Sequence, residues 1–246
     1  MMKKISALLL LLMLSVPASS EELRVIPYSD GIDTQTEGAS SAPKSINHLP
    51  SKYFDTDNDF FTMKSNDTRI ILTNYPTYQQ TKENTCGPAA GLTVLYYFGV
   101  KDYDEAKLTD EMKTKPYPIG TNPKDMLAFF ERLGWETESS LTHPKFNDED
   151  EFIEYVQAKL REGTPIMVEN IDWGGHWRVI IGYDSIGTDT ILDDVLILTD
   201  SYDTCDHKQD GYVVNNAVKF FSMWFDHSMF PDDMKEQPFI TARPKK

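Results

Sequence analysis

Apolar residues recur at helical spacing in the first part of the chain and alternate with polar residues in the later part. The helical spacing predicts four helices, which begin at Cys86, Asp104, Asn122 and Glu151. Alternating, β-branched stretches predict four strands, at Arg69–Thr73, Pro165–Val168, Trp177–Tyr183 and Val195–Thr199. The segment Phe220–Phe225 fits either a strand or a helix. Because most helices precede a sheet that we expect to be antiparallel, the predicted fold class is α+β rather than a wound parallel sheet.

The first 20 residues have the pattern of a secretory signal peptide. Lys3 and Lys4 form a basic head, Ile5–Val16 is an apolar run too short for a stable membrane anchor, and small residues lead to Ser20. Residues 21–69 follow as an N-terminal extension. We expect it to be partly flexible, because Ser, Thr, Pro, Gly and acidic residues dominate its first half. We expect residues 70–246 to form the main domain, and the protein to be secreted or periplasmic with no stable membrane anchor after signal removal.

The chain is strongly acidic. Its formal net charge is −15, and removal of residues 1–20 takes away two lysines and no acid, which leaves 22 basic against 39 acidic residues and a charge of −17. That charge argues against nucleic acid or an anionic membrane as a partner. It is compatible with cationic partners and with divalent cations.

The run Gln-Thr-Lys-Glu-Asn-Thr-Cys-Gly-Pro-Ala-Ala, from Gln80 to Ala90, carries the first candidate chemistry. A thiol in the first turn of a helix lies at the positive end of the helix dipole, which favours the thiolate. Gly87 permits the close approach of a substrate, and Pro88 is tolerated in the first helical turn. The amide of Gln80, six residues before Cys86, can donate to an oxyanion that forms beside the sulfur.

Cys205 is the other of the two cysteines. In an oxidising compartment, a structural Cys86–Cys205 disulfide is the ordinary interpretation of such a pair. A permanent bridge would abolish the nucleophilicity of Cys86, so the two interpretations exclude each other. The residues around Cys86 favour the free thiol.

Two later segments place a histidine and a carboxylate at the ends of predicted strands. His176 follows Gly174-Gly175 and begins one strand, and Asp200 ends another. Adjacent antiparallel strands can place Asp200 behind His176, where the carboxylate would hold the tautomer of the ring and stabilise the imidazolium.

With these residues in the order Gln80, Cys86, His176, Asp200, the chain resembles papain-like cysteine peptidases, and more closely the branch typified by bacteriocin leader (double-glycine) peptidases. The matching elements are Cys-Gly-Pro-Ala-Ala with Gln80 ahead of it, Gly-Gly-His-Trp followed by a strand that ends in Gly-Tyr-Asp, and the strand that ends at Asp200. The resemblance covers about residues 70–205. It implies a papain-like fold, in which the Cys86 helix packs against an antiparallel sheet that carries His176 and Asp200. It also implies that Cys86 is the nucleophile, His176 the general base and acid, Asp200 the residue that orients His176, and Gln80 the oxyanion donor.

The sequence departs from the family pattern between His176 and Asp200. The interval is 24 residues, longer than a short strand–turn–strand unit, and Gly187–Asp194 has the character of an insertion. Asp203 therefore stays as an alternative to Asp200. Gln79 can likewise compete with Gln80, although the spacing favours Gln80.

Three residues around His176 are candidates for substrate binding: Trp173, Gly175 and Trp177. The two tryptophans fit an aromatic wall for substrate, and they fit a lid and core packing equally well.

Two acidic loops are candidate calcium sites, although the expected chemistry requires no cofactor. Asp55, Asp57 and Asp59 have the spacing of a calcium loop, but Phe60 and Asn66 stand where such a loop has Gly and Glu. The second loop, Asp203–Gly211, contains three acidic residues and a lysine.

These residues support acyl transfer at a thiol. We expect an exported, monomeric cysteine peptidase that hydrolyses a peptide or protein substrate through a thioester acyl-enzyme. Two alternatives are an amidase or acyl/peptidyl transferase on the same triad, and a non-catalytic binding module with a Cys86–Cys205 disulfide.

Overall fold

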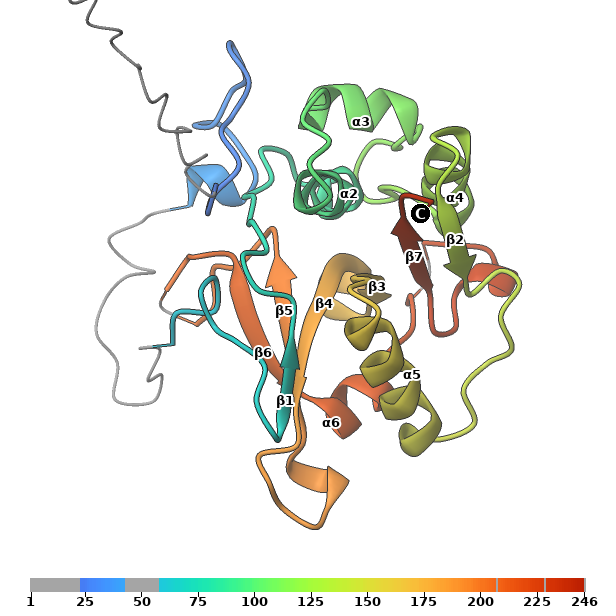
Figure 1. Ribbon diagram of the computed structural model, residues 1–246. Coiled ribbons are helices and arrows are strands. Elements are labelled where there is room, and N and C mark those ends of the chain that lie inside the picture. Colours follow the sequence, from blue (N-terminus) through green and yellow to red (C-terminus); the bar gives the residue numbers. More distant parts are fainter. Residues whose placement is uncertain (1–22, 43–57, 207, 228, 246) are drawn as a thin grey trace, which may run out of the picture.

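Five α-helices are present in the computed structural model, which describes residues 23–42, 58–206, 208–227 and 229–245 (Figure 1). They are α2 (Cys86–Tyr97), α3 (Glu105–Glu111), α4 (Pro123–Arg132), α5 (Glu149–Arg161) and α6 (Ala217–Ser222). No helix in these ranges is long and apolar enough to cross a membrane. The expected signal peptide and the acidic residues Asp55 and Asp57 lie outside the described residues.

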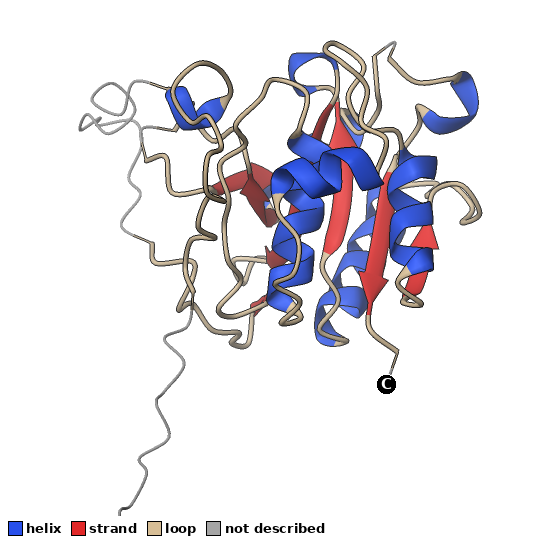
Figure 2. Cartoon of the chain, turned by 90° about the horizontal axis from the view of Figure 1, so that it is seen from above, coloured by secondary structure: helices blue, strands red, loops and turns tan. Residues whose placement is uncertain are grey.

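The strands of the described chain form one seven-stranded sheet. They are β1 (Arg69–Ile71), β2 (Glu136–Ser139), β3 (Ile166–Asn170), β4 (His176–Asp184), β5 (Val195–Asp200), β6 (Tyr212–Asn216) and β7 (Phe239–Arg243). The order across the sheet is β2-β7-β3-β4-β5-β6, with β1 paired to β4, and every pairing is antiparallel. Helices surround this sheet in the view from above (Figure 2). The expected α+β class is therefore confirmed.

Strand β4 organises the centre of the sheet. On one edge it pairs first with β3, where His176 lies opposite Asn170, and then with β1, where Asp184 lies opposite Arg69. On its other edge it pairs with β5, where Arg178 lies opposite Asp200. The start of β4 and the end of β5 consequently meet at the same end of the sheet, and this brings His176 next to Asp200.

Side chains cap four of the five described helices, and α2 is the exception; Asn216 caps α6 by accepting a hydrogen bond from the N–H of Lys219. Asp104, Asn122 and Asp148 accept hydrogen bonds from the first-turn N–H groups of α3, α4 and α5. At α2 the preceding residue is Thr85, which makes no such bond. The hydroxyl of Thr85 lies instead within hydrogen-bond distance of two acceptors, Lys82 O and the Glu105 carboxylate. The N-terminus of α2 is therefore left without a side-chain cap.

Helix α2 is buried along most of its length, since every residue from Cys86 to Leu95 is buried. Its glycines permit this close packing. A Cβ at Gly87 would lie 2.6 Å from the Cβ of Thr121, and a Cβ at Gly91 would lie 2.6 Å from the Met112 Cε. The helix packs against β4 and α3, and this fixes Cys86 relative to the sheet.

The four predicted helices and four predicted strands are confirmed, with ends shifted by a few residues. The ambiguous segment at Phe220 lies partly in α6. Three strands were not predicted: β2, β6 and β7. Because β1 and β2 precede most of the sheet in the chain, the expected order of helices first and sheet second holds only in part.

Part of the N-terminal extension packs onto the main domain. Val25 forms a β-bridge with Thr77, and the side chains of Ile26 and Ala39 are buried. Gly38 lies so close to the backbone of Thr81 that a Cβ there would clash with it. Residues 23–42 thus cover the segment that leads to Cys86, which their composition did not indicate.

Candidate active site

Cys86 is the first residue of α2 and lies at the wall of a cleft of about 140 Å³. We call this space the Cys86 cleft. Its lining includes Gln80, Cys86, Glu169, Trp173, Gly175, His176 and Trp177. The sulfur is largely buried, and it lies at the N-terminus of α2, which no side chain caps. The partial positive charge of that helix end is therefore directed at the thiol and the cleft.

His176 binds Asp200 with one ring nitrogen and leaves the other for Cys86. The Nε2 atom lies 2.7 Å from Oδ1 of Asp200, and both side chains are buried. Burial alone would lower the pKa of His176, but the Asp200 carboxylate and a hydrogen bond with Cys86 outweigh it and raise the pKa to about 9. His176 is therefore an imidazolium at neutral pH.

Two further groups hold Asp200. The backbone N–H of Tyr202 donates to Oδ1 at 2.7 Å, and the buried Arg178 lies with Nη1 3.8 Å from Oδ2. Burial would raise the pKa of Asp200, but His176 and Arg178 together lower it below its usual value. Asp200 is thus a carboxylate fixed between two cations.

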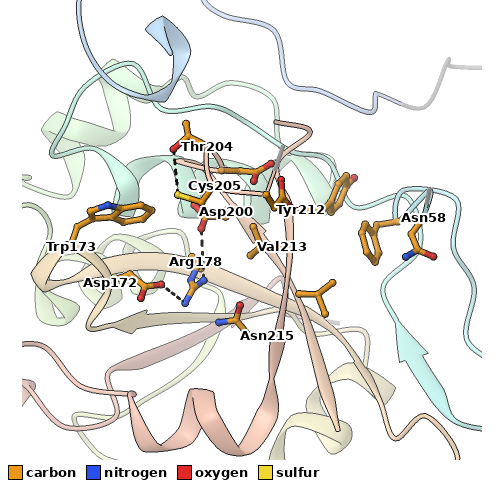
Figure 3. Close-up of a pocket in the computed structure, with 14 residues that line it drawn as sticks. Asn58, Asp172, Trp173, Arg178, Asp200, Thr204, Cys205, Tyr212, Val213 and Asn215 are labelled. Atoms are coloured by element: carbon orange, nitrogen blue, oxygen red, sulfur yellow. Dashed lines mark hydrogen bonds and ion pairs between the residues drawn. The ribbon is translucent and has the colours of Figure 1, made fainter. Parts of the chain in front are cut away.

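A second cavity, of about 610 Å³, lies on the far side of Asp200 (Figure 3). Arg178 lines it and forms an ion pair with Asp172, with 2.9 Å between Nη2 and Oδ2. Trp173 borders both this cavity and the Cys86 cleft. Arg178 therefore links Asp200, at the end of β5, to Asp172, in the segment before β4. Its place in an apolar strand did not indicate this role.

Gln80 and Gln79 point to different parts of the molecule. Gln80 is buried and borders the Cys86 cleft. Its Oε1 accepts a hydrogen bond from Ser201 Oγ at 2.8 Å, and its Nε2 donates to Lys82 O at 2.7 Å. Gln79 instead accepts from the side chain of Gln209 at 2.7 Å. Of the two glutamines, only Gln80 lies beside Cys86.

The three candidate substrate contacts all border the Cys86 cleft, but their exposure differs. Trp173 is 57% exposed, and its ring meets the His176 ring edge-on at 5.0 Å between centroids. Trp177 is buried and donates from Nε1 to Thr121 O at 2.8 Å, so it packs in the core while one side reaches the cleft. Gly175 lies against the carboxyl groups of Glu169 and Asp226.

Asp203 does not contact His176. Its Oδ2 accepts the backbone N–H of Gly211 at 2.8 Å, and burial together with the nearby Asp206 raises its pKa to about 9. Among the described residues, no group of three or more His, Cys, Asp or Glu side chains is arranged to hold a metal ion. The acidic residue placed against His176 is therefore Asp200, and Asp203 closes its own loop.

Both cysteines are free in the structure. Cys86 is buried in its cleft, whereas Cys205 is exposed and borders the cavity below Asp200. The Sγ atom of Cys205 lies 3.8 Å from the hydroxyl of Thr204. The expected alternative of a Cys86–Cys205 disulfide is not the state that this structure shows.

Sequence reasoning missed four residues that shape the site: Arg178, Ser201, Glu169 and Asp226. For Glu169 a signal was available, because an acidic residue stands in the otherwise apolar run Ile-Met-Val-Glu of β3. Ser201 directly follows Asp200, but its contact with Gln80 spans 121 residues of sequence. That contact could not be found from local pattern.

Comparison with known proteins places this geometry in a family. The model described as "Peptidase_C39 like family" matches residues 72–224. No curated protein sequence matches the chain. Among solved structures, the chain is similar to the peptidase domain of Streptococcus ComA, a bi-functional ABC transporter involved in a quorum sensing pathway. That match has 20% identity and a TM-score of 0.48 and covers 70% of this chain and 99% of that one.

A second similar structure is a double glycine motif protease from an AMS/PCAT transporter in complex with the leader peptide. It has 15% identity and a TM-score of 0.41, over 69% of this chain and 91% of that one. The family match spans more than half of this chain, from the residue after β1 to two residues beyond α6. The chain therefore belongs to the Peptidase_C39 like family and is a papain-like cysteine peptidase.

Proposed function

We propose that the protein is an exported cysteine peptidase that hydrolyses peptide bonds with Cys86 as nucleophile, His176 as general base and acid, and Asp200 as the residue that orients His176. One arrangement carries the proposal. Cys86 begins an uncapped helix in the same cleft as His176, whose Nε2 lies 2.7 Å from a buried carboxylate. The triad needs no metal or organic cofactor.

The resting state is a thiolate–imidazolium pair. Asp200 occupies Nε2 of His176, so Nδ1 is the nitrogen that exchanges a proton with the Cys86 sulfur. The raised pKa of His176, about 9, keeps the ring protonated at neutral pH, and the thiolate beside it is the nucleophilic form of the sulfur. The thiolate then attacks the carbonyl carbon of the scissile amide.

The attack places a negative charge on the carbonyl oxygen. The side-chain NH2 of Gln80 and the backbone N–H of Cys86, at the helix N-terminus, are the donors proposed for it. His176 gives its proton to the leaving amine, and the C–N bond breaks. A thioester between Cys86 and the acyl half of the substrate remains.

Water completes the reaction. His176, now neutral, takes a proton from water that attacks the thioester carbonyl, and the C–S bond breaks to release the acid and the thiolate. An amine in place of water would give transfer rather than hydrolysis. A peptide with an added amine acceptor, analysed by mass spectrometry, therefore separates the two reactions.

The direct test compares Cys86→Ala with a matched cysteine variant, Cys205→Ser. Both proteins are incubated with a broad peptide library, and the products are identified by mass spectrometry. We expect Cys86→Ala to lose all cleavage and Cys205→Ser to retain it, because Cys205 lies outside the Cys86 cleft. Cleavage that persists in Cys86→Ala would contradict the proposal.

A thiol-directed peptide-like inactivator tests the pair itself. It should modify Cys86 in the wild-type chain, and Cys86 should lose most of that reactivity in His176→Ala.

Export is tested separately. The mass of protein recovered outside the cytoplasm should correspond to a chain that begins near residue 21, whereas retention of the first 20 residues would argue against signal cleavage.

A further inference from the structure

Glu169 is a buried acidic residue in the wall of the Cys86 cleft that the proposed reaction does not use. It lies in β3, opposite Trp177 of β4, and its side chain is only 1% exposed. Neither Oε1 nor Oε2 receives a hydrogen bond from the described chain. A buried carboxyl group without a donor costs several kcal/mol unless it is protonated or meets a cation.

Asp226 lies beside Glu169 and forms the other half of an acidic pair. A Cβ placed on Gly175 would collide with Oε1 of Glu169 and with Oδ2 of Asp226, so both carboxyl groups lie against the same glycine. The Oδ1 atom of Asp226 accepts the N–H groups of Met229 and Phe230, each at 2.8 Å, whereas its Oδ2 receives no hydrogen bond from the residues that the structure describes. Three carboxyl oxygens therefore gather at one point without donors.

Burial and neighbouring charges both disfavour a negative charge on Glu169. Burial, Asp226 and Cys86 each raise the pKa of Glu169 well above its usual value. A negative charge on Glu169 is therefore costly beside the second carboxyl group. Such a site presents acceptor oxygens to a ligand in the cleft. A positively charged ligand stabilises these carboxyl groups more than a neutral one does.

We propose that Glu169, supported by Asp226, is a specificity-determining residue that binds an ammonium group of the substrate close to the scissile bond. The proposal rests on the proposed peptidase function, since it concerns the same cleft. The ammonium brings a positive charge to the buried carboxyl groups, and its N–H groups supply the donors that the oxygens lack. The cleft is narrow, about 140 Å³, so it suits a slender alkyl-ammonium chain or a peptide N-terminus.

The experiment uses the full exported chain and pairs of peptides that differ by one charge. In one set, each position next to the cleaved bond carries either lysine or norleucine, which has the same alkyl chain without the ammonium. In the other set, the peptide N-terminus is either free or acetylated. The two sets distinguish a side-chain ammonium from an N-terminal one. The variants are Glu169→Gln and Asp226→Asn, with Glu131→Gln, an exposed glutamate of α4, as the matched control.

We expect the wild-type chain to favour the charged member of one set by at least about tenfold in kcat/KM. In Glu169→Gln this ratio falls close to one, and in Asp226→Asn it falls in the same direction. In Glu131→Gln the ratio stays as in the wild type. A cooperative thermal unfolding transition shows that each variant is folded. If Glu169→Gln does not fold, the ratio measured for Asp226→Asn decides the test.

Two outcomes separate this proposal from the one on which it rests. Cys86-dependent cleavage with no preference for an ammonium in either set, or with a preference that Glu169→Gln retains, overturns the role of Glu169 and leaves the peptidase function standing. Absence of any Cys86-dependent cleavage overturns the peptidase function, and the role of Glu169 with it.

Discussion

Ser201 holds Gln80 through both its backbone and its side chain. The N–H of Gln80 donates to Ser201 O at 2.9 Å, and Ser201 Oγ donates to Oε1 of Gln80 at 2.8 Å. The carbonyl end of the Gln80 side chain is therefore occupied, and because one N–H of its NH2 group donates to Lys82 O, the other N–H is left for an oxyanion. Because Ser201 follows Asp200 directly, the end of β5 orients His176 and Gln80 at once.

We expect Ser201→Ala to lower kcat by about tenfold while KM changes little. The variant removes the bond that orients the Gln80 amide but leaves the amide in place. Gln80→Ala removes the donor itself and should cost about 100-fold or more in kcat. Steady-state kinetics on a single peptide substrate measures both effects.

The double variant Gln80→Ala/Ser201→Ala makes the test sharper. If Ser201 acts only through Gln80, the double variant is no slower than Gln80→Ala alone. Ser222→Ala, which removes an exposed hydroxyl in α6 that bonds Lys219 O, is the control and should leave kcat unchanged. Additive losses in the double variant would show that Ser201 acts in some other way.

Asp200→Asn should move the alkaline limb of the pH–rate profile to lower pH. Burial lowers the pKa of His176, but Asp200 and Cys86 raise it to about 9, so activity that needs the imidazolium falls as the pH rises through about 9. Without the carboxylate charge, the ring loses its proton at lower pH. The dependence of kcat/KM on pH reports this value for the free enzyme.

Asp203→Asn is the matched control for that shift, since Asp203 bonds Gly211 rather than His176. The free energy of unfolding should also fall at alkaline pH. The folded pKa of His176 exceeds its unfolded value of about 6.5, so its stabilising contribution is complete below about pH 6.5 and is lost as the pH rises through about 9. An alkaline limb that moves in Asp203→Asn and not in Asp200→Asn would contradict the assignment.

The helices were predictable because their signals are local. For α4, Asn122 caps the first turn, Pro123 follows it, and Met126, Phe129 and Phe130 form the buried face. Strand β2 gave no such signal, since its sequence Glu-Thr-Glu-Ser is polar and only Ser139 is buried. Its partner, β7, lies about 100 residues further along the chain and inserts between β2 and β3. Pairing over that distance leaves no periodicity to detect.

The candidate active site likewise combines residues with local sequence signals and residues without them. Cys86, Gln80 and His176 stand in short motifs whose local structure suits their chemistry, and the sequence alone was sufficient to single them out. The choice between Asp200 and Asp203 needed the register of β4 on β5, which aligns Arg178 with Asp200. The acidic pair of Glu169 and Asp226 needed the placement of a loop more than 50 residues away from β3.

A chelator should leave the activity unchanged. The proposed nucleophile, base and oxyanion donors are all groups of the chain itself. In the second acidic loop, Asp203–Gly211, Lys208 Nζ lies 3.5 Å from Asp210 Oδ2 and offsets part of the negative charge of the loop. We expect kcat/KM and the melting temperature to be the same after treatment with EDTA and after addition of calcium. A loss with EDTA that calcium restores, and that Asp206→Asn abolishes, would instead assign a calcium site to this loop.

Glu105→Gln should destabilise the loop that positions Gln80 and Cys86. The buried Glu105 carboxylate, at the start of α3, accepts hydrogen bonds from the hydroxyls of Tyr78, Thr81 and Thr85 and from the backbone N–H of Thr81. An amide cannot accept all four, so we expect the free energy of unfolding to fall by about 2–4 kcal/mol and kcat to fall with it. Denaturant unfolding measures the first effect. Glu111→Gln, which removes an exposed partner of Arg132 at the other end of α3, should cost no more than about 1 kcal/mol. Equal costs for the two variants would show that Glu105 does not hold the loop.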